Sequence, residues 1–194
     1  MDEKELVDRF YQAFDATLTI LWSATKAFLS EKETPLKESV EQFREAMKAR
    51  VANAEQIIAK ADKNDAEKRF VNLVLPFQTV VLGIEALLFR MLTKVRMRIL
   101  ISEKAFGELR NLFKIMEGQL RNTKDYVQTK NPHLKQAIRE GMEQMMTLAD
   151  NYAMIHHERL IAGVCVPEAS YLYVDMTDAF KRVSRALVDF AERF

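Results

Sequence analysis

The chain has 194 residues, of which 48% are hydrophobic and 29% charged, with 29 Lys and Arg against 28 Asp and Glu. This balance is typical of a globular protein with a buried core and excludes a disordered chain. The 5 glycines and 4 prolines are too few for the turns of an all-β fold or a doubly wound sheet, so the composition predicts long helices. The single cysteine, Cys165, excludes an internal disulfide framework and indicates a reducing compartment.

The N-terminal sequence MDEKELVDRF is acidic and polar, whereas a secretory signal has a basic start and an apolar core. We therefore expect a cytoplasmic protein. Only the segment 71–89 approaches the length of a membrane span, which needs about 20 apolar residues. It contains four residues that disfavour a span: Asn72, Pro76, Gln78 and Glu85. A helix buried on most sides by its neighbours is the preferred interpretation.

Three helices are predicted in the first half of the chain. Apolar residues recur at spacings of three and four from position 6 to about 30, which places them on one stripe of a helix. After a break at 31–35, the same spacing predicts a second helix that continues to the polar run at 62–65. A third helix is predicted over 65–101, with a kink or an extra boundary at Pro76, which removes one backbone hydrogen bond.

Three more helices are predicted in the second half. Ser102 is a suitable cap for a fourth helix, which ends before the pair at 131–132. The fifth helix follows Pro132 and ends near Gly163. Pro167 then begins a sixth helix, whose apolar stripe continues to the C-terminus.

The predicted fold is therefore all-α, with six helices in two successive triplets of similar length. The triplets cover 1–101 and 102–194, and no Gly/Ser-rich linker separates them. We interpret them as two three-helix units packed together, on the pattern of breaks alone.

The charge is unevenly distributed along the chain. The segment 90–139 has twelve Lys and Arg and only four Asp and Glu. Such a basic segment suits a nucleic acid, an anionic membrane or an acidic partner, but its cations fall on several helix faces and favour an ordinary solvated surface. No nucleic-acid-binding motif accompanies them, so we expect no nucleic-acid partner.

The sequence has no recognisable catalytic motif. His133, His156 and His157 have no nucleophile at a familiar spacing, and phosphate-binding and nucleophile-elbow motifs are absent from the sequence. No Glu has a His three positions later, which disfavours a carboxylate-bridged di-iron bundle. We expect a protein that is not an enzyme, with Cys165 packed as a small hydrophobic residue rather than acting as a thiol or metal ligand.

The segment 156–187 contains the most informative pattern in the chain. Its distinctive residues are His156, Arg159, Leu160, Gly163, Cys165, Pro167, Glu168, Ser170, Asp175 and Arg182. In these residues the segment resembles the PhoU-like domain, especially the form attached to sodium/phosphate cotransporters. The resemblance implies two three-helix bundles side by side and a non-enzymatic regulator of phosphate transport or signalling. Its implied partners are a phosphate transporter or a sensor kinase at the inner membrane face, and a second copy of the chain.

Many PhoU-like proteins bind iron or zinc clusters through an E-x-x-x-D motif, because acids four residues apart share one helical face. When Asp175 and Arg182 are aligned with the family, Lys181 stands in place of the Glu and Arg185 in place of the Asp. The third helix offers Gln78 and no acid at the comparable depth. Because cations repel a metal ion, we expect no metal and no cofactor.

Two interpretations of these cations remain open. Asp178 can pair with Lys181 or Arg182 at i+3 or i+4, which would make an ordinary surface array of ion pairs. Alternatively, Lys181, Arg182 and Arg185 form a site for phosphate or a phosphorylated partner. The corresponding alternative function is a generic helical scaffold or anion-binding adaptor unrelated to phosphate.

The junction between the fifth and sixth helices contains His156 and Arg159, the last two residues predicted to contact an anion or a partner. Gly163 is expected in the left-handed conformation and Pro167 in the first helical turn. Arg159 falls in the last turn of the fifth helix, where a cation is favoured. We expect His156 and His157 to contribute hydrogen bonds or surface contacts there, without coordinating a metal.

Overall fold

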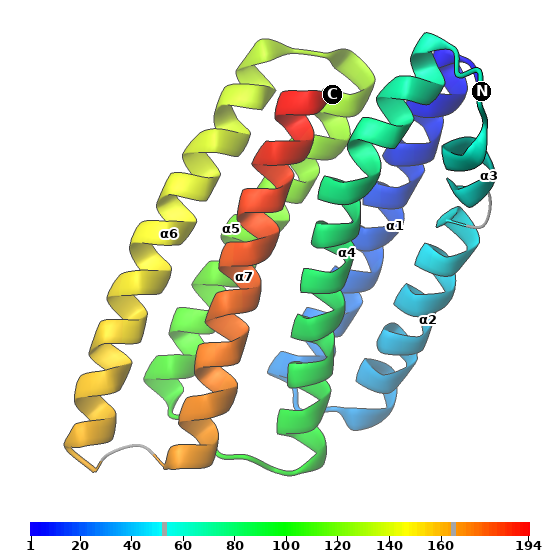
Figure 1. Cartoon of the computed structure of the whole chain (residues 1–194). Helices are drawn as coiled ribbons and strands as arrows, with labels where there is room; N and C mark the ends of the chain where they lie inside the picture. The colour runs from blue at the N-terminus through cyan, green and yellow to red at the C-terminus, as the bar shows by residue number, and fades with distance from the viewer. Residues whose placement is uncertain (52–53, 164–165) are drawn as a thin grey trace.

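The computed structural model describes residues 1–51, 54–163 and 166–194, and within them the chain is all-α (Figure 1). Its helices are α1 (Glu3–Leu29), α2 (Glu33–Val51), α3 (Ala54–Ala59), α4 (Asp65–Arg96), α5 (Glu103–Thr129), α6 (Pro132–Ile161) and α7 (Pro167–Arg193). The all-α prediction is confirmed, whereas the described part of the chain holds seven helices instead of the six expected.

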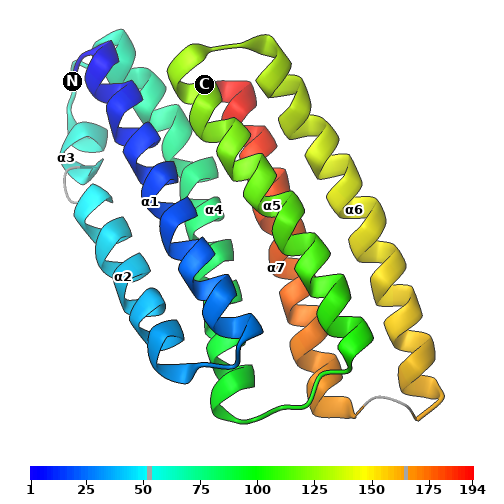
Figure 2. The same cartoon turned by 180° about the vertical axis from the view of Figure 1, so that it is seen from behind.

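The long helices lie roughly parallel or antiparallel in two layers. Helices α4 and α7 lie side by side at the front of Figure 1, and α1 and α5 lie side by side at the front of Figure 2. Helix α2 packs against α1 and α4 at one edge, and α6 packs against α5 and α7 at the other. The four inner helices therefore separate the two outer ones.

One hydrophobic core runs through both layers and both halves of the chain. Aromatic rings form its centre near the chain termini. Phe10 and Phe14 of α1 make edge-to-face contacts with Phe77 of α4 and Phe190 of α7, with ring centroids 5.0 to 5.6 Å apart. Because such pairs add to the energy of burial, this cluster couples the first and last long helices.

Most helix ends follow the chemistry of their capping residues. The Ser102 side chain accepts from the backbone N–H of Ala105 at the start of α5, as predicted. Pro132 and Pro167 lie in the first turns of α6 and α7, and Gly163 has a φ of 70°. The predicted stop and start signals of the second half are thus confirmed.

The described residues of the predicted second helix form two helices, α2 and α3, on either side of 52–53, so the six-helix count is not confirmed. Helix α2 ends at Val51, and α3 is a separate short helix that contacts α4. Ile58, predicted on the inward stripe, is 44% exposed, whereas Ala54 is buried. The apolar spacing in the sequence continues through α2 and α3, so the spacing alone predicted a single helix.

Helix α4 ends at Arg96, before the predicted end near Ile101. Arg98 has a φ of 53°, and the backbone N–H groups of Arg98 and Ile99 donate to the carbonyls of Val95 and Lys94. This left-handed residue closes the helix in the way that glycine usually does. Pro76 introduces no boundary, since α4 is continuous through it.

Helix α4 is long and apolar enough to cross a membrane by length and composition, and 44% of its most apolar window is buried within the protein. Leu75, Leu82 and Phe89 follow one another at seven-residue spacing on its exposed side. The expected burial on most sides is thus only partial: one stripe of α4 is open to solvent.

Candidate functional site

The predicted cations of the last helix line one pocket. This "α7 pocket" has a volume of about 480 Å³ and is formed by α7 and α4. Its lining residues are Pro76, Thr79, Asp178, Lys181, Arg182, Arg185, Ala186 and Asp189. The helical period explains the arrangement, because Val183, Ser184 and Ala186 are buried and leave Arg182 and Arg185 on the solvent side. The structure therefore brings Lys181, Arg182 and Arg185 together.

Lys181 is engaged by two acids. Its ammonium lies 3.2 Å from Asp150 of α6 and 3.1 Å from Asp178 of α7. Burial disfavours the charged form of Lys181, but the hydrogen bonds and charges of Asp178 and Asp150 outweigh burial and raise its pKa above the ordinary value. The ion-pair interpretation thus holds for Lys181.

Arg182 and Arg185 differ from Lys181. Neither forms an ion pair with any residue that the structure describes, and both are exposed. The acids of the pocket are already bound elsewhere, since Asp178 contacts Lys181 and Asp189 lies 2.8 Å from Arg193. The α7 pocket can therefore offer two planar guanidinium groups to an anion, a geometry that suits carboxylates and phosphates.

His156 and Arg159 belong to a second group, the "Glu108 cluster", formed by Glu108, His156, Arg159 and Tyr173. The Arg159 guanidinium donates to both oxygens of Glu108, at 3.2 and 2.8 Å. The Tyr173 hydroxyl donates to the same carboxylate at 2.8 Å. The His156 ring stacks on Tyr173, with centroids 4.3 Å apart.

The protonation states within the Glu108 cluster follow from burial. Burial and the nearby Arg159 charge lower the pKa of His156, and Glu108 opposes them. Burial and the hydrogen bond to Glu108 raise the pKa of Tyr173. At neutral pH the histidine is neutral and the tyrosine keeps its proton for Glu108. The hydrogen bonds and the ring contact of the cluster join α5, α6 and α7 to one another.

The sequence did not single out Glu108 or Tyr173. A signal was present, because Glu108 lies three residues after Ala105 and four before Leu112, both buried. An acid on an inward stripe needs a cationic partner. Which cation it meets depends on tertiary packing, since Tyr173 and Arg159 come from two other helices.

The other candidate ligands do not converge. His133 and His157 are exposed, whereas His156 is buried, and Cys165 lies outside the described residues. Across 1–51, 54–163 and 166–194, no group of three or more His, Cys, Asp or Glu side chains could hold a metal ion. Lys181 and Arg185 both line the α7 pocket.

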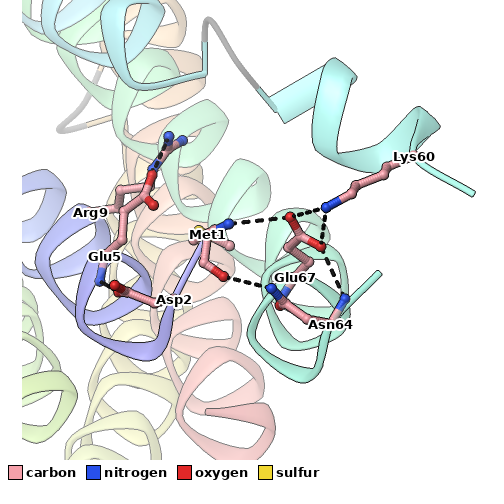
Figure 3. A network of polar contacts seen from close by, with 7 residues as sticks. All are labelled: Met1, Asp2, Glu5, Arg9, Lys60, Asn64 and Glu67. Carbon is pink, nitrogen blue, oxygen red and sulfur yellow. Dashed lines mark hydrogen bonds and ion pairs between the residues drawn. The ribbon is translucent and has the colours of Figure 1, made fainter. Parts of the chain in front are cut away.

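A third polar cluster lies where α1 begins, around Glu67 of α4 (Figure 3). The Met1 ammonium and the Lys60 ammonium lie 3.2 and 2.9 Å from Glu67, which also accepts from the Asn64 backbone N–H at 3.0 Å. Asn64 in turn caps the Glu67 N–H and donates to the Met1 carbonyl. Hydrogen bonds from Lys60, Asn64 and the ammonium of Met1 lower the pKa of Glu67 to about 2. Sequence reasoning missed this cluster, although N-x-x-E is a capping-box pattern.

No family model, no curated protein and no solved structure matches this chain.

Proposed function

We propose that this protein is a cytoplasmic, non-enzymatic regulator of the PhoU-like type. It acts by protein–protein contact on phosphate transport or phosphate signalling. Its partner is a phosphate transporter or a sensor kinase at the inner membrane face, and no nucleic acid is involved. The proposal includes a homodimer, which sedimentation of the purified chain tests directly.

The packing of the helices is the observation that supports this proposal most. Helices α1, α2 and α4 contact one another, and so do α5, α6 and α7. The two triplets meet through α1 with α5 and through α4 with α7. This is the pattern expected of two three-helix bundles side by side. The segment 156–187 contains the end of α6 and the start of α7, with Gly163 and Pro167 in the expected roles.

The proposed contact surface is the α7 pocket. A regulator that binds without chemistry needs an exposed and specific surface. Arg182 and Arg185 form no ion pair with a residue that the structure describes, and they present their charge beside Thr79 and Pro76 of α4. Their guanidinium groups would contact acidic side chains or a phosphorylated group of the partner.

The test combines capture of the partner with a physiological measurement. The tagged chain is cross-linked in cells, membranes are solubilised, and captured proteins are identified. Phosphate uptake is then measured in a deletion strain that carries the wild type, Arg182→Glu/Arg185→Glu, or the matched control Lys4→Glu/Lys48→Glu. We expect capture of a phosphate transporter or sensor kinase, with uptake and capture changed by the first pair only. Normal uptake in the deletion strain, together with capture of proteins unrelated to phosphate, would contradict the proposal.

Arg182 and Arg185 have no acidic partner within the described parts of the chain, which also favours a second candidate function, an anion-binding adaptor unrelated to phosphate transport. Calorimetric titration with inorganic phosphate and with a phosphopeptide separates the two. The adaptor is favoured if the phosphopeptide binds, Arg182→Ala/Arg185→Ala abolishes binding, and phosphate uptake in the deletion strain is normal.

A further inference from the structure

A second pocket lies between α1 and α5, far along the chain from the α7 pocket. Trp22, the only tryptophan in the sequence, stands at its edge and is 59% exposed. The residues that matter in this "Trp22 pocket" are Trp22, Lys26, Leu29, Arg110, Phe113 and Lys114, and its volume is about 450 Å³. Sites for small molecules span roughly 300 to 1,000 Å³, so the pocket has the size of one.

The floor of the Trp22 pocket is apolar and firmly held. Phe113 is 4% exposed and packs edge to face against Phe180 of α7, with centroids 4.8 Å apart. Its ring also packs against that of Phe28 of α1, with centroids 6.1 Å apart. A ring that enters the pocket would meet Phe113 and Leu29 below and the indole of Trp22 at the edge. These groups favour a flat, apolar ligand body.

The rim of the pocket has excess positive charge. Lys26, Arg110 and Lys114 form no ion pair with an acid in the part of the chain that the structure describes. The acid that lines the pocket, Glu117, is bound to Arg121 at 2.8 Å. The Lys26 ammonium lies 5.4 Å from the centroid of the Trp22 ring, within the range of a cation–π contact. Three cations thus surround an aromatic edge.

We propose that the Trp22 pocket binds a small aromatic anion: a planar ring that carries a phosphate or a carboxylate group. The ring lies on Phe113 and beside Trp22, and the anionic group is held by Arg110, Lys114 and Lys26. Arg110 and Lys114 belong to the basic segment 90–139, which contributes no residue to the α7 pocket. A concave site with an apolar floor favours a small molecule over an extended partner surface. The inference is independent of the regulatory function proposed above.

The only tryptophan makes the test direct, because all indole fluorescence comes from a residue that lines this pocket. With excitation at the red edge of indole absorption, the protein is titrated with adenosine monophosphate and with benzoate, which are a ring phosphate and a ring carboxylate. Adenosine and inorganic phosphate serve as the ring-only and charge-only arms. We expect saturable quenching by at least one of the two aromatic anions, at concentrations about tenfold below those at which adenosine or phosphate alone has an effect, because each charge-assisted contact adds to binding. If only adenosine monophosphate quenches saturably, the anionic group is a phosphate; if only benzoate does, it is a carboxylate.

Two double variants locate the site. Arg110→Ala/Lys114→Ala should raise the dissociation constant about tenfold or more, because two charge-assisted contacts are lost. The matched control Lys4→Ala/Lys48→Ala, at two exposed lysines that line neither pocket, should leave the dissociation constant unchanged. Far-UV circular dichroism and the unfolding midpoint confirm that both variants are folded. Trp22→Phe, measured by calorimetry, should weaken binding without abolishing it.

Three results would overturn the proposal. The first is the absence of saturable quenching by both aromatic anions. The second is equal quenching by inorganic phosphate, which would indicate charge alone. The third is a blue shift with anionic lipid vesicles and no response to the soluble anions, which would make this face a membrane contact.

Discussion

Arg159, in the last turn of α6, donates hydrogen bonds to both carboxylate oxygens of Glu108 near the start of α5, at 3.2 and 2.8 Å. Both side chains are largely buried, with 13% and 7% of their surfaces exposed. Tyr173 of α7 donates to the same carboxylate. One acid therefore joins three helices that meet in the second half of the chain.

Glu108→Ala should be among the most destabilising substitutions of an acid in this protein. It leaves the Arg159 charge and the Tyr173 hydroxyl without their carboxylate, and breaking a buried pair costs about 3–5 kcal/mol. Urea unfolding measures the loss. The control is Glu5→Ala, which removes a half-exposed i,i+4 partner of Arg9 and should cost less than about 1 kcal/mol. Similar losses for the two variants would show that the Glu108 cluster contributes little.

Gly163→Ala should destabilise the α6–α7 turn more than His157→Ala does. Gly163 has a φ of 70°, and a Cβ placed on it would meet no atom within 4 Å, so the whole cost is that of the backbone conformation. That cost is about 1–2 kcal/mol for a residue with a side chain. His157 is exposed, and its truncation should change stability by less than about 0.5 kcal/mol. Thermal unfolding midpoints compare the two variants. A larger loss of stability for His157→Ala would show that the histidine, and not the conformation of Gly163, stabilises the junction.

Gly83→Ala should destabilise the contact between α4 and α7, whereas Gly118→Ala should stabilise the protein. A Cβ on Gly83 would lie 2.6 Å from Val183 Cγ2, while nothing lies within 4 Å of a Cβ on Gly118. Overpacking costs about 1–3 kcal/mol, and alanine gains about 0.8–1.0 kcal/mol over glycine in an open helix position. Denaturant midpoints of both variants, with Gly83→Ala/Val183→Ala as the rescue, test this. Stabilisation by Gly83→Ala alone would contradict the close approach.

Acid should weaken the protein partly through Glu67. Its pKa is lowered from 4.5 to about 2 in the folded protein, so folding favours the ionised carboxylate. The resulting stability is fully present above the unfolded pKa and is lost as the pH falls from 4.5 towards 2. The unfolding midpoints of the wild type and Glu67→Gln should differ most at about pH 5 and above, and converge as the pH approaches about 2. A difference that does not vary with pH would exclude this linkage.

Local chemistry explains which parts of the fold were predictable. Ser102, Pro132, Gly163 and Pro167 each act through their own backbone and near neighbours, so the sequence locates their helix ends. The end of α4 escaped prediction, because Arg98 adopts a positive φ that its residue type does not favour. The α2–α3 division also escaped, since the apolar spacing runs through it.

The candidate sites also differ in how far local sequence predicts them. Lys181, Arg182 and Arg185 share one helix, so their spacing alone placed them on one surface. The Trp22 pocket combines α1 with α5, so Trp22 and Arg110 line the same pocket only after the two halves pack. A one-dimensional pattern contains no information on which helices become neighbours.

The antiparallel contact between α4 and α7 has a consequence for synthesis of the chain. Arg90 lies 2.7 Å from Asp175, and Gly83 approaches Val183, so the face of α4 that joins them is covered by the last helix. While a ribosome makes the intervening residues, this apolar helix has no cover on that side. Because transiently exposed apolar surface is prone to aggregate, we expect the nascent chain to be most prone to aggregation before α7 emerges.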